Sequence, residues 1–195
     1  MASLPEADRA SYNAGVLIEN EFDVAAQPAQ VYELMLDPER VATCLPGAEV
    51  TGKNDDGSYD AQATVKLGPV KMTYKGTVAI VESDPAARTA SMLAKGSETR
   101  GQGTAQATLH MAVAEHEGGS HVTVAADMLI TGRVAQMGRG IMQDVARRMI
   151  GQMAQNMEAL LAGGEQPAAG DSVSAGSLLG SVVADRAKRL FGSGE

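Results

Sequence analysis

The chain has 195 residues, which is enough for one sizeable hydrophobic core and a tail. Its formal net charge is −8, and this argues against a general nucleic-acid binder, because that function needs a basic surface. Only 3% of the residues are aromatic and none is Trp. A core made of such small side chains must be filled in another way or be left partly empty.

Cys44 is the only cysteine, so we expect no internal disulfide and, most simply, a reducing compartment. Residues 1–14 are polar and resemble no secretion signal, and we expect them to be disordered. The sequence has no run of about 18 apolar residues, so no transmembrane helix is expected. These features predict a cytoplasmic protein.

The predicted elements begin with a strand over residues 16–24, where apolar and polar residues alternate. Pro28 then opens a short helix. Asp37-Pro38 starts a second short helix, which ends at Cys44-Leu45-Pro46-Gly47. Proline suits the first turn of a helix because the N–H group that it lacks would have no partner there.

The next residues, up to Ile130, are expected to form about six antiparallel strands. In residues 59–67 the odd positions are apolar and the even ones polar, which is typical of a strand with one buried face. The alternation recurs, with turn signals between the segments, over residues 70–80, 90–94, 101–115 and 122–130.

Residues 134–161 contain no proline and predict one long helix. Its apolar face comprises Val134, Met137, Ile141, Val145, Met149, Met153 and Leu160. An antiparallel sheet with one apolar face must be covered, and only this helix is long enough to cover it. The sequence therefore predicts an α+β fold over residues 15–162. In this fold a curved antiparallel sheet of about seven strands grips a long C-terminal helix, with two short helices after the first strand.

The inward-facing positions of the predicted strands are rich in alanine. These positions are Ala61, Ala63, Ala90, Ala94, Ala105, Ala107 and Ala126. Either the helix packs closely on them, or the sheet curves away and leaves an apolar cavity suited to a lipid-like ligand. For the second case we expect a ligand site formed by Met35, Leu45, Met72, Tyr74, Met92, Leu109, Met111, Met128, Met137, Ile141, Val145 and Met149.

The sequence gives little support for catalysis. Three histidines, His110, His116 and His121, lack the spacing to carboxylates or thiols that a metal site needs, and strand pairing places His110 opposite about Ala125. Cys44 has no evident base beside it, and the inward faces carry almost no carboxylates. We therefore predict no catalytic residues and no metal site.

The last part of the chain divides into a predicted flexible linker, residues 163–177, and an amphipathic tail, residues 178–195. Three interpretations of the tail remain open: a frayed end, a short helix that binds anionic lipid headgroups, or a helix that docks on a partner protein. For membrane binding the expected residues are Leu178, Leu179, Val182, Val183, Arg186, Lys188, Arg189, Leu190 and Phe191.

Several segments match a known family. They are Phe22–Val24, Pro28–Tyr32 with Leu34, Asp37–Glu39, Cys44–Ala48, Val65–Val70, Tyr74 with Gly76, Gly101–Gly103 and residues 123–140. On these segments, over about residues 15–162, the chain resembles the CoxG family, named for carbon monoxide dehydrogenase. The order of elements is similar to that of the START-like helix-grip (SRPBCC) superfamily, whose members often enclose an apolar ligand cavity.

The resemblance implies an accessory role beside a molybdenum-dependent carbon monoxide dehydrogenase or a related molybdenum hydroxylase, at the inner face of the cell membrane. It supplies no catalytic residues. Together with the expected cavity and tail, it leads to the hypothesis that the protein delivers a lipophilic quinone, of the menaquinone or ubiquinone type, from the membrane to the enzyme. Tyr74 would offer its hydroxyl to a quinone carbonyl. The alternatives are a structural tether that carries no ligand, and a small enzyme such as a cyclase of the same superfamily.

Overall fold

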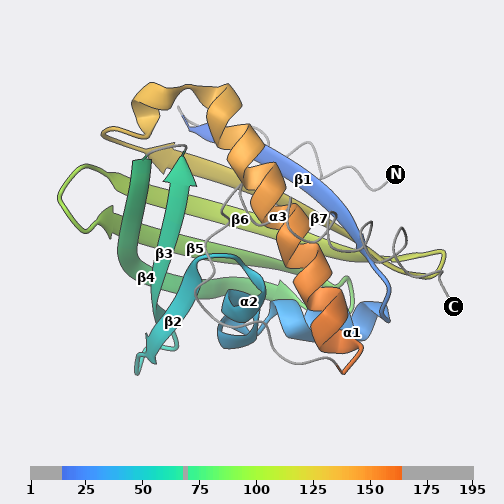
Figure 1. Ribbon diagram of the computed structural model, residues 1–195. Helices are drawn as coiled ribbons and strands as arrows, with labels where there is room; N and C mark the ends of the chain where they lie inside the picture. The colour runs from blue at the N-terminus through green and yellow to red at the C-terminus, as the bar shows by residue number, and fades with distance from the viewer. Residues whose placement is uncertain (1–14, 68–69, 164–195) are drawn as a thin grey trace, which may run out of the picture.

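The computed structural model describes residues 15–67 and 70–163 (Figure 1). The predicted disordered N-terminus, almost all of the predicted linker and the whole predicted tail lie outside the described residues, so their roles stay predictions. The elements are, in order, β1 Val16–Val24, α1 Pro28–Met35, α2 Pro38–Cys44, β2 Ala48–Lys53, β3 Tyr59–Leu67, β4 Val70–Asp84, β5 Thr89–Glu98, β6 Thr104–His116, β7 Gly119–Ile130, the 3-10 turn η2 Ala135–Met137 and α3 Arg139–Leu161.

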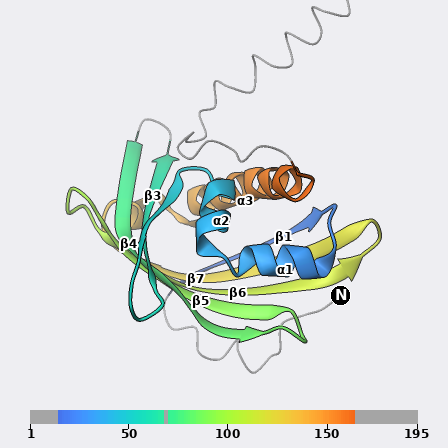
Figure 2. The ribbon, with the colours of Figure 1, turned by 90° about the horizontal axis from the view of Figure 1, so that it is seen from below.

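The strands form one antiparallel sheet in the order β1-β7-β6-β5-β4-β3-β2. Figures 1 and 2 show that this sheet is strongly curved, with β3 and the first half of β4 standing across the direction of β5–β7, and that α3 lies over its concave side. The predicted α+β architecture, with seven strands, a long C-terminal helix and two short helices after the first strand, is confirmed. In the described part of the chain no helix is both long and apolar enough to cross a membrane.

The bend in β4 depends on a glycine. A Cβ atom on Gly76 would collide with the carbonyl oxygen of Lys95 and the Cα atom of Gly96 on β5. Only a residue without a side chain lets the two backbones approach this closely. The sheet therefore curls at this point, and the curl turns the inner faces of β3 and β4 toward those of β6 and β7.

The two short helices cover the end of the sheet where β1 ends and β7 begins. Pro28 stands in the first turn of α1, as the sequence predicts. The carboxylate of Asp37 accepts the backbone N–H groups of Glu39 and Arg40 at 3.1 Å and so caps α2. The first and larger hydrophobic cluster lies beneath these helices and includes Leu34, Met111 and Met157.

The long helix differs from the expectation at its start. Gly138 has φ +83°, which ends the turn η2 and makes α3 begin at Arg139 rather than at residue 134. Ile141 is 45% exposed, whereas Met142, absent from the expected face, is buried. A step of four residues overshoots one helical turn by about 40°, so the repeated steps of four from Met153 back to Ile141 rotate Ile141 off the buried face.

Two polar contacts hold the second half of α3 in place. Asn156 donates a hydrogen bond from Nδ2 to the carbonyl oxygen of Cys44 at 2.8 Å, and Glu158 accepts the N–H of Ala25 through Oε1 at 3.1 Å. The first half of α3 contacts the second hydrophobic cluster, formed by Ile18, Met72, Val134 and Met142. The cavity described next lies beside this second cluster.

Candidate functional site

A cavity of about 300 Å³ lies between the inner face of the sheet and the first half of α3. Larger apolar side chains that line it are Ile18, Val65, Tyr74, Met128, Ile130, Val134, Met142, Val145 and Met149. Small residues that line it are Ala61, Ala63, Gly76, Ala94, Gly96, Ala105, Ala107 and Ala146. Of the two outcomes that the inward alanines left open, the structure therefore has the cavity rather than the filled core.

The strand register explains why space remains here. Ala61, Gly76, Gly96 and Ala105 stand opposite one another in turn across β3, β4, β5 and β6. Such a row presents almost no side-chain volume to the helix. Since interiors normally close to crystal-like density, a void over a row of this kind results from the residues chosen at it.

Four of the 12 predicted site residues line the cavity, namely Tyr74, Met128, Val145 and Met149. Met72 and Met137 belong to the adjoining second cluster. The others lie away from it: Met35, Met111, Leu45 and Met92 are in or against the first cluster, Leu109 is half-buried on β6, and Ile141 is exposed. Whether any of these residues binds a ligand stays a prediction.

Sequence reasoning missed the glycines of the wall, Gly76 and Gly96, and the helix residues Met142 and Ala146. The signal for the glycines was their spacing: each stands at an inward position of a strand, two residues from an inward residue, Tyr74 and Ala94. The signal for Met142 was its distance of 11 residues from Met153, close to three whole helical turns.

The hydroxyl group of Tyr74 is the polar feature of the cavity. It is the one buried side-chain oxygen or nitrogen, among the described residues, that has no hydrogen-bond partner. Burial raises the pKa of the Tyr74 hydroxyl, and the negative charge of Glu98, its neighbour across β4 and β5, raises it further. At neutral pH the group is therefore a protonated donor that lacks an acceptor.

Glu98 has its own partners. Its Oε2 atom accepts the backbone N–H groups of Arg100 at 2.7 Å and Gln102 at 3.2 Å. Burial opposes the charge of this carboxyl group, but these N–H groups outweigh that effect and keep the pKa of Glu98 below its ordinary value. The carboxylate therefore braces the loop between β5 and β6.

The remaining titratable groups do not converge on the cavity. His110 lies opposite Ala125, as expected from the hairpin, and its Nδ1 atom is 2.9 Å from Oγ of Ser91. Cys44 is fully buried, and burial raises the pKa of its thiol. No group of three or more His, Cys, Asp or Glu residues within 15–67 and 70–163 is arranged to hold a metal ion. The arrangement suits binding of an apolar molecule with one polar anchor.

A curved antiparallel sheet that grips a long helix around an apolar cavity defines the START-like class of proteins. Solved structures with this fold include a conserved protein from Geobacillus kaustophilus, with a TM-score of 0.66 and 17% sequence identity over 75% of this chain and 95% of that one. A START superfamily protein from Mycobacterium smegmatis gives 0.51 and 13%, over 75% and 97%. The Zhui aromatase/cyclase from Streptomyces sp. R1128 gives 0.53 and 15%, over 76% and 98%.

The family is narrower than the fold. Residues 21–162 match the model of the carbon monoxide dehydrogenase G-type subunit (CoxG), and the chain belongs to this family. The resemblance found in the sequence is thus confirmed. No curated protein matches the sequence.

Proposed function

We propose that this protein is a non-catalytic accessory protein of carbon monoxide dehydrogenase that takes a lipophilic quinone from the cytoplasmic membrane and delivers it to the enzyme. The partner follows from the family to which the chain belongs. The ligand class follows from one observation, an apolar cavity whose wall carries a single hydroxyl group without a partner.

A quinone meets both requirements of this cavity. Its ring carbonyl accepts a hydrogen bond from Tyr74, and its prenyl chain contacts the alanine, valine and methionine walls. A buried donor without a partner costs about 1–3 kcal/mol, so an acceptor at this position removes a penalty that the empty protein bears. A fully apolar guest, such as an alkane, leaves that penalty in place.

The cavity volume limits how much of the ligand is enclosed. About 300 Å³ is at the lower end of the range for ligand pockets and accommodates the ring with the first part of its chain. Three methionines, Met128, Met142 and Met149, line the space, and their unbranched side chains adapt to guests of different length. Both the menaquinone and the ubiquinone type satisfy these limits.

Transfer requires that the quinone bind no more tightly than it can be released. The prenyl chain is already in an apolar surrounding within the membrane, so moving it into an apolar cavity gains little hydrophobic free energy. The exchange is then close to balance. The chemistry takes place on the enzyme, where carbon monoxide, water and quinone become carbon dioxide and quinol.

Electron delivery in a reconstituted system tests this proposal. Ala107 is buried on the cavity wall, so Ala107→Phe fills the space, whereas Gln106→Phe adds the same ring to the outer face of β6. With the dehydrogenase and quinone-containing vesicles, Ala107→Phe should slow carbon monoxide oxidation at least tenfold and Gln106→Phe should not. Equal activity of both variants, with the wild type still required, would support a tether without a ligand.

A further inference from the structure

The charges of the described residues are sorted between the two halves of the molecule. Because every strand is antiparallel to its neighbours, the start of β4 and β6 and the end of β3, β5 and β7 meet at one end, beside the first half of α3 and the cavity. Nine of the 12 Lys and Arg residues in the described part belong to this half, but only four of its 18 Asp and Glu residues do. The molecule is therefore acidic overall but basic at the cavity end.

The exposed residues at the tip of this end define a surface, which we name the basic end: Lys66, Lys71, Arg133, Ile141 and Arg148. Lys66 and Lys71 stand directly opposite each other on β3 and β4. Like charges in this position destabilise a sheet. Neither lysine forms an ion pair within residues 15–67 and 70–163, so nothing described in the protein offsets their repulsion.

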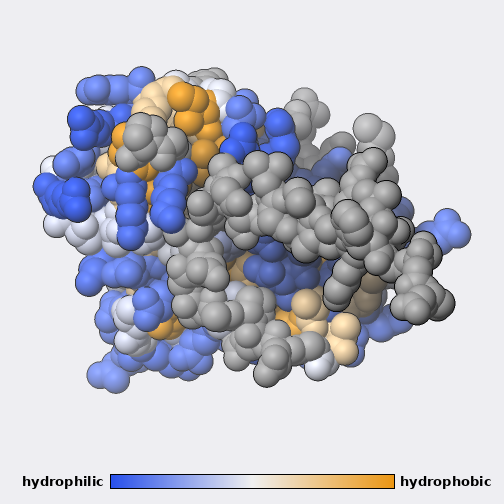
Figure 3. Space-filling model, viewed as in Figure 1, coloured by the Kyte–Doolittle hydropathy of each residue, from blue (hydrophilic) through white to orange (hydrophobic). Residues whose placement is uncertain are grey.

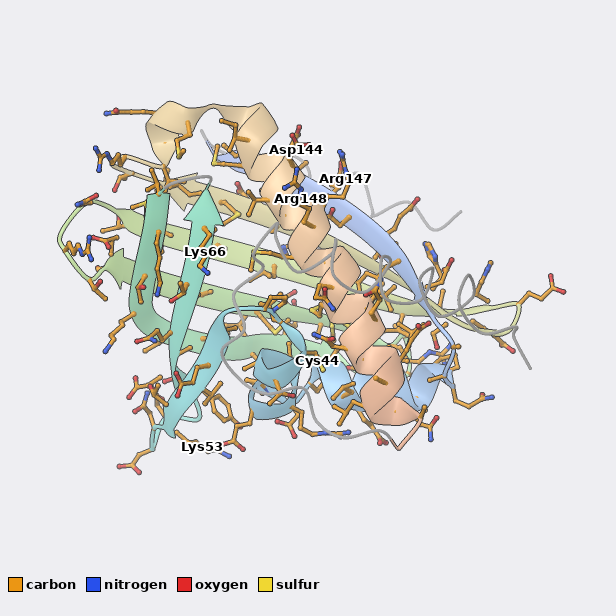
Figure 4. The ribbon with its side chains drawn as sticks, viewed as in Figure 1. Cys44, Lys53, Lys66, Asp144, Arg147 and Arg148 are labelled. Carbon is orange, nitrogen blue, oxygen red and sulfur yellow. The ribbon has the colours of Figure 1, made fainter. Side chains whose placement is uncertain are left out.

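Apolar side chains lie among these cations. Ile141 is 45% exposed at the start of α3, and Figure 3 shows hydrophobic atoms on the surface at this end, over η2 and the start of α3, with hydrophilic residues around them. Figure 4 shows Lys66 on β3, with Arg147 and Arg148 on the facing helix. An apolar tip within a basic rim is the combination that anionic lipid surfaces attract.

We propose that the basic end is a membrane-docking surface for anionic phospholipid, separate from the C-terminal tail. Val134 and Met142 lie directly behind this surface, and both also line the cavity. Docking in this orientation places the bilayer next to the cavity and turns the acidic half of the molecule toward the solvent. The inference goes beyond quinone transport, because it needs no ligand and holds for any cargo.

Vesicle binding of the full chain tests the proposal without a quinone. The variant Lys66→Glu/Lys71→Glu reverses two charges at the basic end. The control Arg40→Glu/Lys53→Glu makes the same change in net charge in the acidic half, and Figure 4 shows Lys53 at the far end from Lys66. At about 1 kcal/mol for each cation near an anionic surface, the first variant should bind vesicles of phosphatidylglycerol and phosphatidylcholine at least tenfold more weakly. The control should bind within about twofold of the wild type.

A second measurement detects the orientation even where the tail contributes most of the affinity. Because Cys44 is buried, a polarity-sensitive dye can be attached at Ile141→Cys or, as the control, at Val81→Cys, which replaces a side chain 57% exposed on the far part of β4. Anionic vesicles should shift only the emission of the dye at residue 141 to shorter wavelength. Equal losses in the two charge variants, no loss in either, or no shift at residue 141 would overturn the proposal. Binding of the basic end to an acidic protein instead would leave the residue 141 dye unshifted by vesicles.

Failure of this test and failure of the proposed function are distinguishable. A protein that docks through its basic end but carries no quinone would retain the vesicle result and lose the electron-delivery result. The reverse outcome, delivery without docking at this end, would leave the quinone proposal intact.

Discussion

Gly76 on β4 lies directly opposite Gly96 on β5, at the point where the sheet bends around the cavity. A Cβ atom on Gly76 would collide with the backbone of β5, and one on Gly96 would lie 3.3 Å from the carbonyl oxygen of Lys75. The pair thus serves two purposes at once. It lets the strands approach closely, and it leaves the cavity wall without side chains.

The first prediction concerns this pair. Gly76→Ala should destabilise the protein by about 1–3 kcal/mol, because the added methyl group meets the backbone of β5 rather than a movable side chain. Gly151→Ala is the matched control. It lies within α3 with nothing within 4 Å of the added atom, and it should stabilise the protein by about 0.5–1 kcal/mol. Urea unfolding measures both, and equal effects of the two changes would contradict the role given to Gly76.

A second prediction separates the two buried tyrosine hydroxyls. Tyr74→Phe removes a donor without a partner, so the empty protein should be as stable as the wild type or more so. The same change should weaken binding of a short-chain naphthoquinone by roughly fivefold, since one hydrogen bond is worth about 1 kcal/mol. The measurements are unfolding of the empty protein and a binding titration.

Tyr32 supplies the control for that experiment. Its hydroxyl donates a hydrogen bond to the carbonyl oxygen of Thr89 at 3.0 Å, away from the cavity. Tyr32→Phe should therefore lower stability by about 1 kcal/mol and leave naphthoquinone binding unchanged. If Tyr74→Phe behaves like Tyr32→Phe in both measurements, the hydroxyl of Tyr74 has no role in binding.

A third prediction follows from Glu98 and concerns pH. The pKa of this group is lowered in the folded protein, so its contribution to stability is present above the ordinary pKa of 4.5 and is lost as the pH falls through the lower, folded value. Glu98→Gln should therefore be less stable than the wild type at pH 7, and the difference should shrink below about pH 4. Thermal unfolding across this pH range measures the difference. Glu115→Gln, an exposed change on β6, should show no such convergence.

The sequence predicts the order of elements well because each depends on local patterns. Alternation marks the strands, and Pro28 and Asp37 mark the short helices, whose first turns they occupy or cap. The inward alanines were also identified, and five of the seven line the cavity. These predictions need no knowledge of which strands become neighbours.

The position of the cavity within the sheet could not be predicted in the same way. Met111 and Met128 stand on the same inner face, on β6 and β7, yet Met111 packs into the first cluster and Met128 lines the cavity. The difference arises from the bend at Gly76 and from the short helices that fill the other end. Both are long-range consequences of the fold, and alternation along one strand does not contain them. The exposure of Ile141 is likewise set by the break at Gly138.

Extraction of quinone from a membrane tests the central claim most directly. The purified full-length protein is mixed with vesicles that contain menaquinone, separated from them, and analysed for bound quinone by mass spectrometry. The wild type and Gln106→Phe should each carry up to one quinone per chain, and Ala107→Phe should carry at least tenfold less. Protein fractions free of quinone, or an equal amount on Ala107→Phe, would contradict the assignment of the cavity as a quinone site.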